Sequence, residues 1–150
     1  MNPWTLRDLE RGDIPRILEI ERASFLTPWT EEMFRTQLRF RDRAVTIVLV
    51  EDGVVTGYTA AWIAADEMHL LSIAVSPAAR RAGRGSALLE ALLERGKARG
   101  CERTLLEVRE TNEGARRMYR LYGFREIGKR RGYYADTGED AVIMEHRRGE

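Results

Sequence analysis

Residues 69–108 hold a strand, a glycine-rich turn, a helix and a second strand in close succession. The first strand covers residues 69–75 and the second covers residues 104–108. Between them, the helix at residues 85–99 carries leucines at helical spacing and ends at Gly100. A helical connection carries the chain back to the end of the sheet at which the first strand began. This unit therefore predicts a parallel pair of strands.

The remaining segments predict further strands and helices around this parallel pair. Asp52-Gly53 is a hairpin signal that joins two strands rich in β-branched residues. Asp13 is expected to cap the first helix, and Thr30 is expected to cap the second. The expected strands are 3–9, 45–50, 54–62, 124–128 and 141–145, and the expected helices are one that begins at residue 14, 30–40 and 113–122. Together they predict an α/β fold with a mixed, mostly antiparallel sheet and flanking helices.

Composition indicates the class of protein and its compartment. The 150 residues, of which 43% are hydrophobic, suit a single domain over residues 1–150. The 25 basic and 24 acidic side chains nearly cancel, so neither direct nucleic-acid binding nor a membrane partner is expected, and the basic run 129–131 is expected to be a solvated turn. Cys101 is the single cysteine, which excludes an internal disulfide. No run of about 18 apolar residues is present, and a cytoplasmic protein is expected. His69 and His146 are interpreted as too isolated for a metal site or a catalytic dyad.

The turn that follows the first strand of the parallel pair, with the helix start behind it, is an expected anion site. Its glycines, Gly83 and Gly85, lie where unpaired N–H groups and the positive end of the helix dipole favour an anion. Arg80, Arg81 and Arg84 add positive charge around it. A P-loop is excluded because no Gly-Lys-Ser/Thr is present, and a dinucleotide fingerprint is excluded because its third glycine is missing. Taken alone, the same residues also fit an ordinary tight turn.

Three motifs, in order and at the expected distances, resemble the GNAT superfamily of N-acetyltransferases. They are Arg80-x-x-Gly83-x-Gly85 after residues 73–75, residues 106–109 with Asn112, and residues 118–124. The segment 25–30 and the tail at residues 133–144 resemble the branch that acetylates the N-terminal alanine of ribosomal proteins. The chain departs from the family pattern at Ser72, Ser86 and Tyr122. The departures at Ser72 and Tyr122 bear on how the amine that accepts the acetyl group is bound.

The resemblance implies a GNAT fold, in which the parallel strands splay apart and admit the pantetheine arm of acetyl-CoA. It also implies direct attack of an amine on the thioester, with no metal and no covalent acyl-enzyme. Ile73 and Val75 are expected to pair with pantetheine through their backbones, and Asn112 either bonds to this arm or caps a helix. The full set of expected cofactor-binding residues is Ile73, Ala74, Val75, Arg80, Arg81, Ala82, Gly83, Arg84, Gly85, Ser86, Asn112 and Tyr119.

Glu107 and Tyr119 are the catalytic pair that the resemblance implies. Glu107 interrupts an apolar strand on the face opposite Leu106 and Val108, where a carboxylate would accept a proton from the amine. Tyr119 lies two helical turns after Asn112 and would protonate the departing thiolate. A phenol with a pKa near ~10 is a suitable acid for a thiolate whose pKa is near ~8.5. The alternatives are a solvent-facing glutamate and a tyrosine that only packs between helix and sheet.

The substrate that the resemblance implies is a protein with a free N-terminus, namely the N-terminal alanine of a small-subunit ribosomal protein. Trp29, Tyr133 and Tyr134 are expected to shape a peptide groove, and each would serve equally well as a core residue. Other protein N-termini, internal lysines or a small amine are alternative acceptors. A GNAT-like module that only binds acetyl-CoA is a further alternative, which the presence of both Glu107 and Tyr119 argues against.

Overall fold

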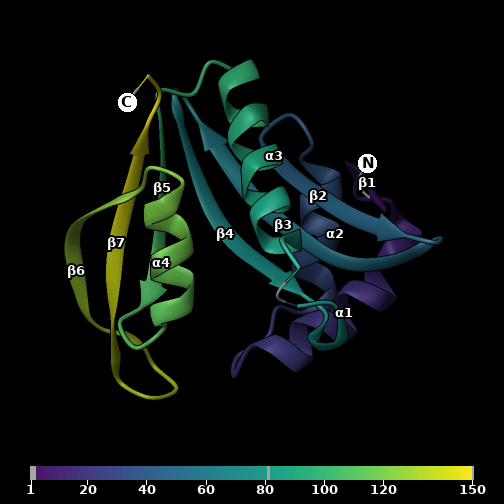
Figure 1. Cartoon of the computed structure of the whole chain (residues 1–150), viewed down its shortest axis with the longest axis horizontal. Helices are drawn as coiled ribbons and strands as arrows, with labels where there is room; N and C mark the ends of the chain where they lie inside the picture. The colour runs from purple at the N-terminus through teal and green to yellow at the C-terminus, as the bar shows by residue number, and fades with distance from the viewer. Residues whose placement is uncertain (1–2, 81, 150) are drawn as a thin grey trace.

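A computed structural model describes residues 3–80 and 82–149, and Figure 1 shows its elements in space. The strands are β1 (Trp4–Asp8), β2 (Ala44–Glu51), β3 (Val54–Ala64), β4 (Glu67–Val75), β5 (Arg103–Arg109), β6 (Arg125–Tyr134) and β7 (Glu139–Arg147). The helices are α1 (Ile14–Ser24), α2 (Glu31–Arg39), α3 (Arg84–Ala98) and α4 (Glu113–Leu121), with short 3-10 turns η1 (Arg11–Asp13) and η2 (Pro77–Ala79). This arrangement confirms the predicted α/β class.

The described strands form one sheet in the order β1-β2-β3-β4-β5-β7-β6. Every neighbouring pair is antiparallel except β4 and β5, which are parallel and joined by the helix α3. Their pairing begins at Glu67 with Arg103 and ends at His69 with Leu105. Beyond that point the two strands diverge, as the lower half of Figure 1 shows. The predicted splayed parallel pair is therefore confirmed.

The sheet carries a helical layer and a hydrophobic core on each face. Side chains of α3 and α4 pack over one face, and side chains of α1 and α2 pack over the other. Strand alternation separates the two cores. In β2, Ile47 and Leu49 belong to the α3 core, whereas Val48 between them belongs to the α1 core. In β5, Leu106 and Val108 face the α3–α4 side, so Glu107 projects from the opposite face.

A bulge interrupts β4 at the place where the parallel pairing ends. Ala60 of β3 pairs with Ser72, and Ala61 pairs with Leu70, so Leu71 has no partner across the ladder. A bulge adds a residue to one strand, bends it and increases its local twist. It therefore helps to turn the second half of β4 away from β5 and opens a gap in the sheet.

Several local predictions are corrected by the structure. Asp13 precedes α1, but its carboxylate does not cap that helix; it accepts hydrogen bonds from the Glu10 N–H at 2.8 Å and from Arg7 at 2.8 and 3.0 Å. Thr30 does cap α2, through its hydroxyl and the Met33 N–H at 3.3 Å. The expected turn at residues 129–131 is wrong, because β6 continues through it. Within residues 3–80 and 82–149, no helix has the length and apolarity that crossing a bilayer requires.

Candidate active site

A cleft of about 1090 Å³ opens where β4 and β5 diverge. The end of α1 and the loop after it, the second half of β4, the start of α3, the end of β5, α4 and the loop between β6 and β7 all contribute to its walls. The cleft therefore has walls from both helical layers. A ligand that lies in it is contacted from the α3–α4 side and from the α1–α2 side of the sheet.

The start of α3 offers unpaired backbone donors to this cleft. Gly83 has a φ of +84°, a left-handed conformation that favours glycine, and it is the N-cap residue of α3. The first backbone bond of the helix runs from the Ala87 N–H to the Gly83 carbonyl at 3.0 Å. The N–H groups of Arg84, Gly85 and Ser86 therefore have no partner within the helix. Together with the helix dipole, they make this wall suitable for an anion such as a pyrophosphate.

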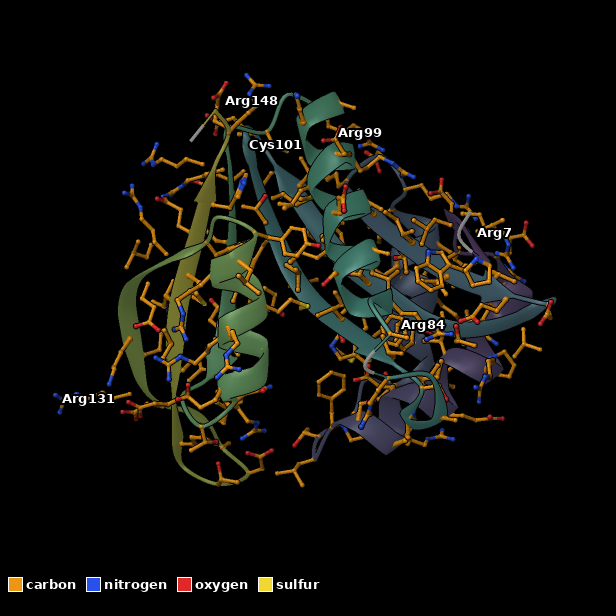
Figure 2. All side chains as sticks on the ribbon, in the orientation of Figure 1. Arg7, Arg84, Arg99, Cys101, Arg131 and Arg148 are labelled. Carbon is orange, nitrogen blue, oxygen red and sulfur yellow. The ribbon has the colours of Figure 1, made fainter. Side chains whose placement is uncertain are left out.

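The arginines around this turn have roles that the sequence did not predict. The Arg84 guanidinium, labelled in Figure 2, pairs with both carboxylate oxygens of Glu51 and donates to the Ala79 carbonyl at 2.9 Å. Its charge is thus largely compensated, and the side chain ties the turn to the end of β2. Arg80 donates to the Val75 carbonyl at 2.9 Å and to the Ser24 hydroxyl at 3.0 Å. Arg81 lies outside the described residues.

Glu107 lines the cleft from β5 and has a basic partner on each oxygen. Its side chain is only 11% exposed, with Oε2 at 2.6 Å from His69 Nε2 and Oε1 at 3.4 Å from Arg130 Nε. The hydrogen bond with His69, assisted by Arg130, keeps the pKa of the Glu107 carboxyl below its usual value, although burial opposes this. The interpretation of His69 as too isolated for a dyad is therefore wrong. The parallel register of β4 and β5 brings these two side chains together.

Tyr119 approaches the same cleft from α4, on the α3–α4 side of the sheet. The residue is 5% exposed and its ring packs at 5.5 Å from the ring of Phe124. Burial raises the pKa of the phenol, so the hydroxyl keeps its proton. Glu107 and Tyr119 therefore present an acceptor and a donor of protons to one cleft from opposite faces of the sheet.

The three aromatic residues predicted to form a peptide groove all line the cleft, although they differ in burial. Trp29 is partly buried and packs at 5.0 Å from the ring of Phe34, so it belongs to the core and to the cleft wall. Tyr133 is 48% exposed and meets the ring of Tyr134 edge-on at 5.0 Å. The Arg109 guanidinium lies 4.0 Å from the Tyr134 ring centroid. Their role in binding a substrate stays a prediction.

Asn112 also borders the cleft, and the structure shows one of its two predicted roles. Its side-chain oxygen accepts a hydrogen bond from the Ala115 N–H at 3.2 Å and caps α4. This bond positions the first turn of the helix that carries Tyr119. A contact between Asn112 and pantetheine stays a prediction.

Glu21 is a cleft residue that the sequence reasoning missed. It belongs to α1, is 1% exposed and lines the α1 side of the cleft. Its carboxylate accepts hydrogen bonds from the Trp29 N–H and from the Ser72 hydroxyl. Glu21 follows the buried Ile17 by four residues and Leu18 by three, which places it on the apolar stripe of α1. This spacing is the feature of the sequence that indicates its burial.

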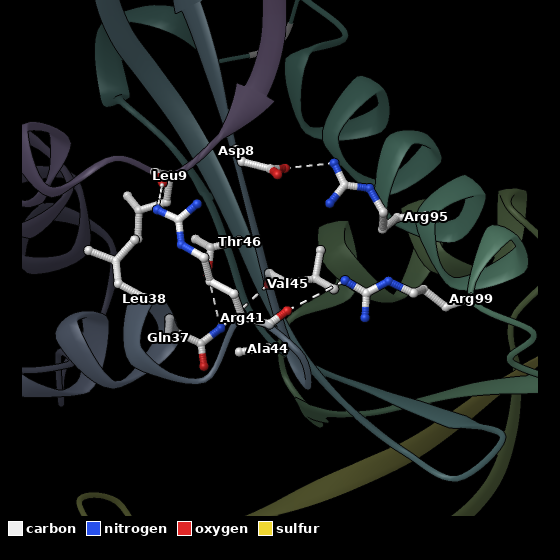
Figure 3. A pocket seen from close by; sticks show the side chains of 10 residues that line it. All are labelled: Asp8, Leu9, Gln37, Leu38, Arg41, Ala44, Val45, Thr46, Arg95 and Arg99. Atoms are coloured by element: carbon white, nitrogen blue, oxygen red, sulfur yellow. Dashed lines mark hydrogen bonds and ion pairs between the residues drawn. The ribbon is translucent and has the colours of Figure 1, made fainter.

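A second pocket is small and is separate from the large cleft. It measures about 40 Å³, and Figure 3 shows Gln37 turned towards Thr46 and Arg95 turned towards Asp8. These contacts measure 2.9 and 2.7 Å, and Arg41 donates to the Leu9 carbonyl at 3.1 Å. Its polar groups are thus paired within the protein, and it shares no lining residue with the large cleft. In the described part of the chain, no three His, Cys, Asp or Glu side chains gather as metal ligands would.

Comparisons with known proteins agree on one family. The profile of the acetyltransferase (GNAT) family matches residues 14–124. The [ribosomal protein bS18]-alanine N-acetyltransferase of Escherichia coli (strain K12) is 36% identical over 142 residues, which cover 93% of this chain and 95% of that protein.

Two solved structures extend this likeness to the whole fold. The crystal structure of the ribosomal-protein-S18-alanine N-acetyltransferase from Escherichia coli aligns with a TM-score of 0.88 at 35% identity, over 96% of this chain and 93% of that one. The structure of Ard1 from Thermoplasma volcanium aligns with a TM-score of 0.91 at 28% identity, over 99% of this chain and 100% of that one. The overall fold of this chain is therefore shared with these two proteins.

Proposed function

Because the chain belongs to the acetyltransferase (GNAT) family, we propose that it transfers an acetyl group from acetyl-CoA to the N-terminal alanine of a small-subunit ribosomal protein. The support for this substrate is the name of a relative with 36% identity over 93% of the chain. The observation that carries the proposed reaction is the placement of Glu107 and Tyr119 in one cleft, on opposite faces of the sheet.

The residues at the start of α3 fit the diphosphate of acetyl-CoA. The N–H groups of Arg84, Gly85 and Ser86 are the donors we assign to the pyrophosphate, and the gap beside Ile73 and Val75 accommodates the pantetheine arm. When bound, acetyl-CoA supplies a thioester whose acyl carbon is open to an amine. Arg84 acts on this site through the position of the turn, since its side chain is bonded to Glu51.

In the proposed reaction, Glu107 and Tyr119 move one proton each. The amine nitrogen bonds to the acyl carbon and gives a proton to Glu107, while the carbon–sulfur bond breaks and the Tyr119 hydroxyl protonates the leaving sulfur. Burial raises the pKa of the Tyr119 phenol, which keeps it in the neutral form that an acid requires but makes it a weaker acid than the ordinary tyrosine assumed from the sequence. The lowered pKa of Glu107 makes it a weak base, so the substrate itself must be easily deprotonated.

An N-terminal amine meets this requirement better than a lysine does. With a pKa of about 7.7–8.0, a substantial fraction of α-amines is neutral near pH 7.5, whereas roughly one lysine side chain in a thousand is neutral there. A weak base such as Glu107 therefore suits an α-amine. The distinguishing experiment compares acetyl-CoA consumption on an Ala-initiated peptide, on its N-blocked form and on a small free amine. Equal rates on the free and blocked peptides would contradict the proposal.

We further infer that residues 1–150 form one catalytic domain that works in the cytoplasm and binds its protein substrate without direct contact with nucleic acid. Part of the support is the pairing of surface charges near the basic strand β6. Lys129 pairs with Glu110 at 2.5 Å, and Arg116 and Arg120 pair with Glu126 at 2.5 and 3.2 Å. These pairs reduce the net positive field that a nucleic acid would require.

A further inference from the structure

The loop between α1 and α2 lines the cleft on the face of the sheet from which Glu107 projects, which we call the acceptor side, and it is fastened at two points. Trp29 donates its backbone N–H to Glu21 Oε2 at 2.8 Å. The Thr27 hydroxyl donates to Asp136 Oδ2 at 2.9 Å, which joins this loop to the loop between β6 and β7. Phe25 and Leu26 precede these contacts and expose apolar side chains at the cleft. The position of this wall therefore depends on the two bonds.

Of the two side chains that accept these bonds, Glu21 is the buried one. Glu21 Oε1 also accepts a hydrogen bond from the Ser72 hydroxyl at 3.4 Å, and the hydroxyls of Ser72 and Tyr58 are 3.3 Å apart. The resulting chain of hydrogen bonds runs from the α1–α2 loop through α1 to β4 and β3. It crosses between elements that the sequence places far apart, as the separation of 51 residues between Glu21 and Ser72 shows.

A buried carboxylate without a cation is costly in a protein. Among the described residues, no Lys, Arg or His side chain forms an ion pair with Glu21. Burial accordingly raises the pKa of the Glu21 carboxyl, while the bonds from Trp29 and Ser72 oppose that change. A leucine would fill the same space in the apolar stripe of α1 without this penalty. The hydrogen bonds to Trp29 and Ser72 are what the carboxylate adds at this place.

The strand that receives the Glu21 network also carries the partner of Glu107. Ser72 and His69 both belong to β4, and the bulge at Leu71 lies between them. At a rise of about 3.3 Å per residue, the two side chains start within about 10 Å of each other along the strand. A shift of the α1–α2 loop against β4 would therefore change the width of the acceptor side of the cleft close to Glu107.

We propose that Glu21 is a positioning residue that fastens the α1–α2 loop to β4 and so sets where the acceptor peptide lies relative to Glu107. This inference rests on the proposed transfer to a peptide amine. Glu21 acts through the backbone of Trp29 and the hydroxyl of Ser72, and it exchanges no proton with the substrate. Its effect is therefore on binding of the acceptor and on preference for the first residue, and the cofactor side of the cleft is unaffected.

The test uses the full chain with three substitutions and two readouts. Glu21→Ala removes both acceptors, Glu21→Gln keeps one oxygen acceptor of the same shape, and Glu19→Gln changes an exposed glutamate on the same helix as the matched control. The KM and kcat for an Ala-initiated peptide are measured, and the affinity for CoA is measured by calorimetry. We expect Glu21→Ala to raise the peptide KM about tenfold or more while kcat and CoA affinity change little. Glu21→Gln and the control are expected to stay close to wild type.

Two results would overturn the inference. An unchanged peptide KM in Glu21→Ala would show that the loop does not need this bond. An equal rise of KM in Glu21→Ala and Glu21→Gln would show that the charge itself binds the substrate amine. If Glu21→Ala does not fold, Ser72→Ala interrupts the same network with a smaller change and is expected to raise the peptide KM in the same direction; an unchanged KM there also counts against the inference.

The wild-type protein separates this inference from the proposed function. If wild type acetylates the free and the N-blocked peptide equally, the proposed N-terminal activity fails. The peptide KM of wild type and of the same variants is then measured on the N-blocked peptide, which the enzyme accepts in that case. A rise of KM confined to Glu21→Ala still supports the positioning role in that case.

Discussion

His69 Nε2 lies 2.6 Å from Glu107 Oε2; His69 belongs to the last residue pair of the parallel strands β4 and β5, and Glu107 lies two residues beyond that pair on β5. Directly beyond this contact the strands separate and the cleft opens. Glu107 is the only carboxylate that we assign to proton transfer. His69 of the neighbouring strand β4 thus holds it at the point where β4 and β5 separate. This contact holds one oxygen of the Glu107 carboxylate and lowers the pKa of that group.

Replacing His69 should change the pH dependence of turnover. The pKa of Glu107 is lowered chiefly by the His69 hydrogen bond, so in His69→Ala it should rise. A base must be ionised to act, and the acid limb of the kcat/KM profile should therefore move to higher pH. The substrate amine titrates identically in both proteins and cancels in the comparison. Superimposable acid limbs for wild type and His69→Ala would count against this assignment of Glu107.

Removing the Tyr119 hydroxyl should slow chemistry and spare cofactor binding. Tyr119→Phe keeps the ring that packs on Phe124 and deletes the only group that we assign to protonation of sulfur. A general acid contributes typically 10²-fold or more, so kcat should fall by about that factor. Calorimetry with CoA should give an affinity close to that of wild type. Unchanged turnover would show that Tyr119 only packs in the core.

Loosening the turn before α3 should lower the affinity for CoA and leave the binding of the peptide unchanged. Glu51→Gln removes one of the two charge-assisted bonds that hold Arg84. We expect a several-fold loss of CoA affinity and an unchanged peptide KM at saturating acetyl-CoA. Glu67→Gln is the matched control, because it weakens an arginine pair with Arg103 at the far end of β4. Equal CoA affinities in the two variants would exclude a role for the Arg84–Glu51 pair in holding the turn.

Two glycines with the same left-handed backbone separate strain from binding. Gly83 has a φ of +84° and Gly100 a φ of +80°, and an added Cβ meets no atom within 4 Å at either position. An alanine at either site should cost about 1–2 kcal/mol of unfolding free energy, measured by denaturant titration. Only Gly83→Ala should also lower the affinity for CoA, since Gly100 follows the other end of α3. Equal CoA affinities would show that the turn at Gly83 does not bind the diphosphate.

The sequence predicted the parts of the fold that depend on local pattern. The helix between residues 85 and 99 and the turn at Gly83 follow from leucine spacing and from glycine, and the structure confirms both. The strand β6 was predicted too short because its residues 125–133 are all exposed and show no apolar alternation.

The missed contacts depend on register rather than on local pattern. His69 and Glu107 are 38 residues apart and meet only because β4 and β5 pair in one particular register. Glu21 was missed for a different reason: a glutamate in a helix is usually a surface residue, and its burial depends on the fit of α1 against β4. Such partners become visible only when the elements are placed in space.

The position of the acetyl group on a single peptide tests the account most directly. The peptide begins with a free alanine and carries an internal lysine, and tandem mass spectrometry locates the modification after incubation with acetyl-CoA. We expect the acetyl group on the α-amine of alanine, because Glu107 is too weak a base to deprotonate a lysine efficiently. Acetylation of the lysine, or of neither amine, would contradict the account.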